Sequence, residues 1–190
     1  MKRDDIREAI EVLRKGGVVL IPTETVVGLV ATEAGLARIQ EIKGREPGKP
    51  ISLICSSTEE AFAQCQNVAP VAERLAGLYW PGPLTLVMER ANGGTIGVRV
   101  PDHPAVQGVL AGYGGPLYAT SANLSGDPAP GSFAEVGQRV LAAVDSIVEG
   151  ESGVGVASAV VDLTGSGARL IRAGGGLTDE KLAALSKDVI

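Results

Sequence analysis

Amphipathic stretches with helical spacing alternate with short, wholly apolar runs along the chain. Ile6, Ile10 and Leu13 recur at helical spacing, so they predict a helix over residues 5–15. Residues 18–21 are all apolar, which is typical of a strand buried on both faces. The same criteria predict helices over 34–42, 59–65 (capped by Thr58), 70–78, 104–111 and 132–144, a last helix capped by Thr178, and strands over 51–55, 84–88, 95–100, 117–119, 146–148, 159–163 and 168–172.

The order of these elements predicts the fold class. Helices and strands alternate first, and strands then come in pairs, which indicates an α/β protein with a mixed, twisted sheet. We find no internal repeat and no linker that would divide the chain; the glycine-rich stretch 150–155 reads as a flexible loop. Residues 1–190 are therefore predicted to form a single domain.

Hydroxyl, carboxylate and amide side chains gather where two predicted strands end. Thr23, Glu24 and Thr25 follow the first strand, and the segment 120–126 follows the strand at 117–119. α/β proteins place ligand-binding groups at such positions, beyond the carboxyl ends of strands. The alternative is structural in both places, namely a turn capped by threonine hydroxyls and a polar loop before two prolines.

The loop from Lys43 to Lys49 is strongly basic. It holds three of the 17 Lys and Arg residues, although the whole chain has a formal net charge of -5. Pro47, with Pro50 directly after the loop, stiffens the backbone, and the glycines allow a ligand to come close. Cations on such a loop, here Lys43, Arg45 and Lys49, are suited to an anion site, with a solvated basic turn as the alternative.

A further cation, Arg99, stands inside an apolar strand. An unpaired buried charge is costly, so this guanidinium needs a partner. The structural alternative is an ion pair with Asp102 or Glu89, and the functional one is contact with an anionic ligand.

Composition narrows the classes of function. Hydrophobic residues make up 45% of the chain, but no apolar run approaches the roughly 18 residues of a membrane span, so we expect a soluble, cytoplasmic protein. Cys55 and Cys65 show no zinc spacing or disulfide framework, so we expect core thiols and no metal site. The one histidine, His103, is expected to be structural. The negative net charge and 3% aromatic content argue against a general nucleic-acid-binding surface.

Familiar nucleotide-binding and catalytic motifs are absent from the sequence. The loop from Gly44 to Lys49 is one residue short of a P-loop, and Pro50 stands where a Ser or Thr would bind magnesium. The chain has no Gly-x-Ser-x-Gly nucleophile motif.

Taken together, the segments resemble the YrdC/TsaC family, the L-threonylcarbamoyladenylate synthases. The motifs follow the family's order over about residues 10–176, and the ordered set is specific although each motif alone is weak. The matching residues are Pro22-Thr23-Glu24-Thr25 with Gly28-Leu29, Lys43-x-Arg45 with Lys49-Pro50, Trp80-Pro81-Gly82-Pro83-Leu84-Thr85, Val98-Arg99-Val100-Pro101 with His103-Pro104, Ser121-Ala122-Asn123-Leu124-Ser125-Gly126, Val160-Val161-Asp162, and Ile171-Arg172-x-Gly174.

The resemblance implies a fold, a reaction and partners. Members of the family have a twisted mixed sheet flanked by helices around a positively charged concave cleft. They join L-threonine, bicarbonate and ATP into threonylcarbamoyl-AMP and pyrophosphate, with Mg²⁺ carried by the nucleotide. A separate transferase complex then uses the product for the t6A modification of tRNA, and weak direct tRNA binding is a further expectation.

Carried over position by position, the resemblance assigns residues to two ligands. The implied ATP contacts are Arg45, Lys49, Thr95, Ser121 and Arg172. The implied L-threonine contacts are Thr25, Arg99, Ser158 and the backbone of Ala119. The catalytic candidates of the cleft are Lys43, Arg45, Ser121 and Asn123, which form the Lys-x-Arg and Ser-x-Asn pairs. No general base is assigned, and Glu24 is a candidate by location only.

Some residues depart from the family pattern. Val27 replaces a common aromatic residue, and Ile54 stands where some members have a histidine near threonine. Further departures are Ala129, Ala159 and Ala173. The chain ends at Ile190, so the resemblance implies that it lacks the extra C-terminal domain of longer relatives.

Two other functions stay open at this point. One is an RNA-binding module that uses the same basic concave surface without turnover, which predicts strong, salt-dependent tRNA affinity. The other is a related carbamoyl-adenylating enzyme with a different acceptor amine, which the Val27 and Ile54 departures allow.

Overall fold

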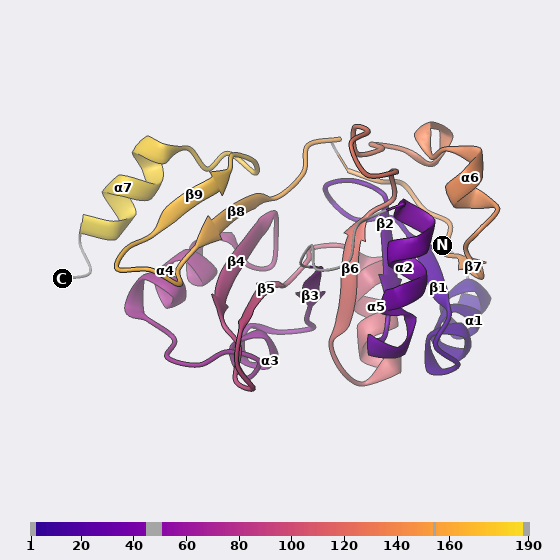
Figure 1. The fold of residues 1–190 in the computed structure, drawn as a ribbon, viewed down its shortest axis with the longest axis horizontal. Helices are drawn as coiled ribbons and strands as arrows, with labels where there is room; N and C mark the ends of the chain where they lie inside the picture. The colour runs from indigo at the N-terminus through magenta and orange to yellow at the C-terminus, as the bar shows by residue number, and fades with distance from the viewer. Residues whose placement is uncertain (1–2, 45–50, 154, 188–190) are drawn as a thin grey trace.

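One mixed sheet organises the structure, a computed structural model that describes residues 3–44, 51–153 and 155–187 (Figure 1). Its strands are β1 (Val18–Ile21), β2 (Gly28–Ala31), β3 (Ser52–Ile54), β4 (Leu84–Glu89), β5 (Thr95–Arg99), β6 (Leu117–Ser121), β7 (Ser146–Ile147), β8 (Ala159–Asp162) and β9 (Arg169–Arg172). They lie in the order β7-β1-β2-β6-β3-β5-β4-β8-β9. The β1–β7, β3–β5 and β4–β8 pairs are parallel and the others antiparallel, so the prediction of a twisted, mixed α/β sheet is confirmed.

Helices lie on both faces of this sheet. They are α1 (Arg3–Arg14), α2 (Leu36–Lys43), α3 (Thr58–Phe62), α4 (Pro70–Tyr79), α5 (Pro104–Tyr113), α6 (Gln138–Leu141) and α7 (Asp179–Lys187), with short 3-10 helices η1 (Glu33–Gly35) and η2 (Phe133–Glu135). Figure 1 shows α7 beside β9 at one end of the sheet and α1 at the β7–β1 end.

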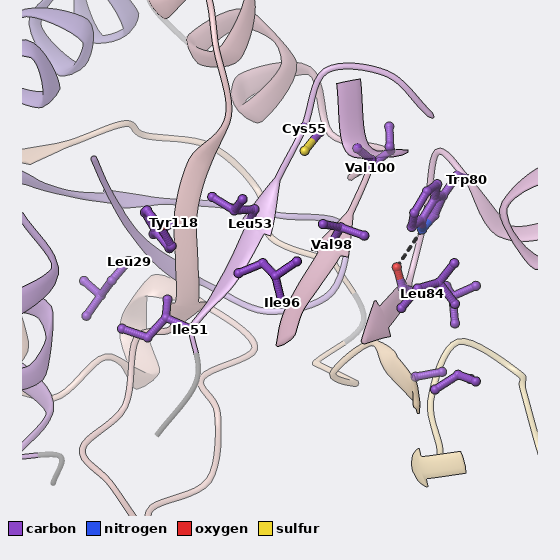
Figure 2. Close-up of a cluster of buried hydrophobic side chains, with 14 of the residues drawn as sticks. Leu29, Ile51, Leu53, Cys55, Trp80, Leu84, Ile96, Val98, Val100 and Tyr118 are labelled. Atoms are coloured by element: carbon purple, nitrogen blue, oxygen red, sulfur yellow. Dashed lines mark hydrogen bonds between the residues drawn. The ribbon is translucent and has the colours of Figure 1, made fainter. Parts of the chain in front are cut away.

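The larger hydrophobic core lies on one face, under α2, α3, α4 and α7. Successive strand residues point to opposite faces, so alternate residues of most of the strands enter this core. Leu53, Leu86 and Val98 come from three neighbouring strands and are at most 3% exposed. Trp80 closes this core between α4 and β4, and its Nε1 donates to the Leu84 carbonyl oxygen at 2.7 Å (Figure 2).

The opposite face carries a second, smaller core at the β1–β2–β6 end. Helices α1 and α5 contact each other and cover this part of the sheet. Leu13 of α1 and Val109 of α5 pack here against Val19 and Val30 of the strands. The strand residues that continue this face beyond α5 belong to a pocket instead of a core.

Three element predictions are wrong. Strand β2 was not predicted, because Gly28–Ala31 was not separated from the segment of polar residues that follows β1. The predicted helix over 132–144 is only η2 followed by α6, because Gly137 between them has an extended backbone. The N-cap of α3 is Ser57, not Thr58, since the Ser57 Oγ accepts from Glu60 N at 3.2 Å.

No helix in the described ranges combines the length and the hydrophobicity that a membrane span requires.

Candidate functional site

A pocket of about 380 Å³ occupies the part of the second face that α1 and α5 leave open. The pairing of β3, β5 and β4 sets Ser52, Gly97 and Val87 side by side in its wall. A Cβ atom on Gly97 would lie 2.6 Å from Ser52 Oγ and 3.2 Å from Thr85 Cγ2. Glycine at this position therefore keeps the middle of the pocket clear of side chains.

Every described residue that the sequence assigns to ATP or L-threonine lines this pocket. These residues are Thr25, Thr95, Arg99, Ala119, Ser121, Ser158 and Arg172. Arg45 and Lys49, the other two assigned residues, lie outside the described residues. The structure thus brings together residues of β5, β6 and β9 with Ser158, which precedes β8, and Thr25, which lies in the turn after β1.

Arg99 is held at the pocket by the turn that follows β1. Its Nη2 donates to Glu24 Oε1 at 2.6 Å and to Thr25 Oγ1 at 3.0 Å, while Nε donates to the Gly82 carbonyl oxygen at 3.2 Å. The ion-pair partner is therefore Glu24, and neither Asp102 nor Glu89 takes that role. Nη1 has no hydrogen-bond partner among the described residues, so its two N–H groups remain available to a ligand.

The two threonines of this turn form a directed chain of hydrogen bonds. Thr23 Oγ1 donates its single proton to the Val26 carbonyl oxygen at 2.7 Å. The proton in the 2.8 Å contact between Thr23 Oγ1 and Thr25 Oγ1 therefore comes from Thr25. With its proton used in this way, Thr25 Oγ1 faces Arg99 as an acceptor.

The wall formed by β8 and β9 presents hydrogen-bond donors. Arg172 Nε donates to the Ser158 carbonyl oxygen at 2.9 Å, and its Nη2 donates to Ser158 Oγ at 3.2 Å. Ser158 Oγ also lies 3.0 Å from Thr85 Oγ1, and both hydroxyl residues are buried. Burial, and then the nearby charge of Arg99, lower the pKa of Arg172. Two guanidinium groups that line one pocket favour the binding of an anion there.

Lys43 and Asn123 are not among the described residues that line the pocket. Lys43 Nζ donates to the carbonyl oxygens of Ser121 and Asn123, the latter at 2.7 Å, and lies 3.3 Å from Asn123 Oδ1. In addition, Ser125 N donates to the Lys43 carbonyl oxygen at 2.8 Å. Lys43 thus joins the end of α2 to the end of β6 and the turn that follows it. Ser121, the last residue of β6, lines the pocket.

The segment before β8 is fixed along the turn after β1. Gly153 N donates to the Thr23 carbonyl oxygen at 2.8 Å, and Gly155 N donates to the Thr25 carbonyl oxygen at 3.0 Å. A Cβ atom on Gly153 would lie 1.6 Å from the Glu24 carbonyl oxygen, so only glycine permits this approach. Gly153 and Gly155, which belong to the stretch predicted as a flexible loop, are therefore hydrogen-bonded to the turn that carries Thr23 and Thr25.

The side chains of Cys55, Cys65 and His103 are not among the described residues that line the pocket. Within residues 3–44, 51–153 and 155–187, no three His, Cys, Asp or Glu side chains gather as a metal site would require. Burial raises the pKa of Cys55 to about 12 and that of Cys65 to about 11, so both stay protonated thiols near neutral pH. His103 Nδ1 accepts from Ala105 N at 3.2 Å and caps α5.

Comparison with known proteins identifies the family. The family model Sua5/YciO/YrdC, with the description "Telomere recombination", matches residues 11–174. The chain belongs to this family. A "Threonylcarbamoyl-AMP synthase" of Pyrococcus abyssi is 37% identical over 183 residues, which are 90% of this chain and 54% of the relative. The protein of the same name from Xanthomonas euvesicatoria is 34% identical over 163 residues, covering 78% of this chain and 87% of the relative.

Solved structures of Sua5/YciO/YrdC proteins share the fold. The crystal structure of P. abyssi Sua5 complexed with L-threonine has a TM-score of 0.89 and 34% identity, over 97% of this chain and 58% of that one. E. coli YciO has a TM-score of 0.84 and 28% identity, over 95% of this chain and 94% of that one. The chain thus spans little more than half the length of the Pyrococcus relative.

Sequence reasoning missed some residues of the Sua5/YciO/YrdC pocket. Thr85, Ser52 and Gly97 line it but were not assigned to a ligand. Thr85 could have been found, because it ends the Trp80–Thr85 motif and alternates with the core residues Leu84 and Leu86. Ser52 and Gly97 also alternate with core residues, but they belong to none of the quoted motifs, and only the strand pairing shows that they lie side by side.

Proposed function

We propose that the chain is an L-threonylcarbamoyladenylate synthase, which forms threonylcarbamoyl-AMP and pyrophosphate from L-threonine, bicarbonate and ATP. The observation that carries the proposal is the shared pocket of Thr25, Arg99, Ala119 and Ser158 with Thr95, Ser121 and Arg172. Two relatives named threonylcarbamoyl-AMP synthase, each at least 34% identical, support it. The complex of P. abyssi Sua5 with L-threonine supports the amino-acid site.

The proposed reaction has two steps. The threonine nitrogen attacks the carbon of CO₂ derived from bicarbonate and loses a proton, which gives a carbamate. A carbamate oxygen then attacks the α-phosphorus of ATP, and the bond to the β-phosphate oxygen breaks to release pyrophosphate. Both steps need positioned reactants and neutralised charge more than a nucleophilic side chain.

The side chains of the pocket suit these steps. Arg99 presents the free N–H groups of Nη1 to the threonine carboxylate, and Thr25 Oγ1 offers an acceptor beside it. Arg172 and Ser121, with Thr95, meet the nucleotide, and we assign Arg45 and Lys49 to its phosphates as the sequence predicts. Mg²⁺ is assigned to the triphosphate, because this ion keeps several waters and usually binds through substrate phosphates. It would there neutralise phosphate charge.

The wider assignments follow from the same proposal. The adenylate would pass to the transferase complex that makes t6A in tRNA, and the reaction is assigned to the cytoplasm. We also propose that residues 1–190 form one domain, since one sheet takes strands from Val18 through Arg172.

The test is pyrophosphate release from ATP by the purified protein with Mg²⁺, with and without L-threonine and bicarbonate. Release that requires both, together with the mass of threonylcarbamoyl-AMP, is the expected result. Arg45→Ala should abolish it in folded protein. Release with another amino acid but not with threonine would replace threonine as the substrate, and folded protein that releases none would refute the synthase.

A further inference from the structure

We propose that Glu24 is a positioning residue of the amino-acid site, which holds the Arg99 guanidinium so that Nη1 faces the ligand carboxylate; this rests on the proposed function. Glu24 does not line the pocket, whereas Arg99 and Thr25 do. Its carboxylate therefore acts through Arg99 and is not placed to touch the substrate. Its side chain is 18% exposed and that of Arg99 is 12% exposed, so water screens their 2.6 Å contact weakly.

The donors of Arg99 are divided between the protein and the pocket. Nη2 serves Glu24 and Thr25, and Nε serves the Gly82 carbonyl oxygen. Three acceptors from two separate segments fix the plane of the guanidinium, which leaves Nη1 as the group without a partner among the described residues. Without Glu24, the strongest of these anchors is lost, because a charged acceptor binds Nη2 more tightly than a hydroxyl does.

The second oxygen of the carboxylate distinguishes Glu24 from an ordinary structural ion pair. Oε2 is buried and has no hydrogen-bond partner, and it is the one such side-chain atom found in the part of the chain that the structure describes. A buried acceptor without a partner is unfavourable, so a carboxylate kept for stability alone would be expected to satisfy both oxygens. A carboxylate kept to orient Arg99 needs only Oε1.

The backbone around Glu24 is fixed as well. Thr23 Oγ1 accepts from Thr25 N at 3.1 Å and from Val26 N at 3.2 Å. These hydrogen bonds link the residue before Glu24 to the two residues after it and so fix the turn. Gly153 approaches the Glu24 backbone from the other side. The carboxylate is thus presented to Arg99 from a rigid support, as a positioning group requires.

The charge balance of the pocket gives Glu24 a second effect. Arg99 lies close enough to Arg172 for the two guanidinium charges to interact. Glu24 offsets one of these charges in the empty pocket, so that Arg99 stays oriented instead of turning away from Arg172. The ligand carboxylate then adds to Nη1 without having to displace Glu24 from Nη2.

The experiment compares Glu24→Gln, Glu24→Asp and Glu24→Ala with the wild type in steady-state turnover. Glutamine keeps an acceptor without the charge, aspartate keeps the charge without the reach, and alanine removes both. Each should raise the KM for L-threonine by about tenfold or more, with alanine highest, while the KM for ATP changes by a factor of less than about three. The matched control is Asp145→Asn. It removes the charge of another carboxylate that forms an ion pair with an arginine, Arg38, and Asp145 does not line the pocket. It should lower the melting temperature and leave the KM for L-threonine unchanged.

A second readout does not depend on turnover. In ¹⁵N NMR of the arginine side chains, the Nη signals of Arg99, assigned with Arg99→Lys, should show hindered rotation in the wild type and averaging in Glu24→Gln.

The outcomes separate the two proposals. Threonine-dependent turnover with equal changes in both KM values, or with none, overturns the positioning role. If the wild type shows no threonine-dependent turnover, the synthase proposal fails, and the NMR signals alone decide on Glu24: averaging only in Glu24→Gln supports its role, and identical spectra refute it.

Discussion

Two parts of one sheet face differ in what covers them: helices pack on one part, and the other part lines a pocket. At the β1–β2–β6 end, inward residues such as Val19 and Leu117 are aliphatic, and α1 and α5 cover them. Further along the same face, the inward residues include Gly97, Arg99 and Thr85, and a pocket takes the place of a helix. The strand pairing is continuous across both parts, so the backbone does not distinguish them.

The difference lies in which side chains can be satisfied by packing. Aliphatic residues gain from a helix placed over them, because burial removes their surface from water. Arginines and hydroxyls need hydrogen-bond partners, and here they find them in the turn after β1 and in each other. A face built from such residues stays open to a ligand, and the N–H groups of Arg99 Nη1 are available to bind it.

The largest expected effect on turnover comes from a substitution in the pocket, at Arg99. Arg99→Ala should reduce kcat/KM for L-threonine by about 100-fold or more, because a charge-assisted pair with the carboxylate is lost. Turnover with varied L-threonine, together with thermal melting, measures this. Arg99→Lys is the control: it keeps a charge beside Glu24 and the fold, but it lacks the planar fork, so it should recover only part of the rate. Wild-type turnover by folded Arg99→Ala would exclude Arg99 from the site.

A substitution in the helix-covered part should lower stability and leave substrate binding unchanged. Leu13 is fully buried between α1 and the sheet, so Leu13→Ala should lower the free energy of unfolding by about 2–5 kcal/mol through the cavity it leaves. Denaturant unfolding measures the loss. Below the melting transition, the KM for L-threonine should stay at the wild-type value, and a change in KM would show that the two parts are coupled.

Filling the pocket tests its shape. Gly97→Val should raise KM for L-threonine or ATP by about tenfold, because the new side chain would meet Ser52 and Thr85 across the pocket. Gly97→Ala is the graded control, with a smaller increase expected. Unchanged kinetics in both variants would mean that substrates do not use this part of the pocket.

Removing one hydroxyl from the donor wall should have a smaller effect. Thr85→Val keeps the shape but leaves Ser158 Oγ without one partner, so kcat/KM should fall by about three- to tenfold. Thr85→Ser should restore it. A loss in Thr85→Ser but not in Thr85→Val would point to packing of the methyl group instead of the hydroxyl.

The smallest effect concerns the thiol in the large core. Burial raises the pKa of Cys55 from 9.0 to about 12, so the folded state favours the neutral thiol. Its contribution to stability is complete below pH 9 and is lost as the pH rises toward 12. Relative to Cys55→Ala, wild-type stability should therefore fall across this window in denaturant titrations. Rapid alkylation of native Cys55 at pH 8 would contradict its burial.

The sequence predicted most elements and the sheet class, and the described residues that it assigned to ligands line one pocket. Apolar runs such as 18–21 were sufficient for strands, because burial on both faces leaves no other pattern. It did not predict the partner of Arg99. Glu24 lies 75 residues away in the sequence, and only the sheet order brings the turn after β1 to the end of β5. Likewise, the break at Gly137 was missed, because a capping signal at Ser132 predicted a longer helix.

Lys43 also makes contacts that its motif does not state. Its place in a basic loop predicts contact with an anion, and in the structure its Nζ also donates to the carbonyl oxygens of Ser121 and Asn123. A charged side chain that is 4% exposed takes the partners that the fold provides, and the sequence pattern does not state them.

The most direct measurement of the central claim is a crystal structure of the protein with L-threonine bound. The account predicts that the threonine carboxylate lies on Nη1 of Arg99, between Thr25 and Ser158, with Glu24 still on Nη2. Threonine bound elsewhere, or an Arg99 that has left Glu24 to reach it, would contradict the claim that the uncovered part of the sheet face is the prepared amino-acid site.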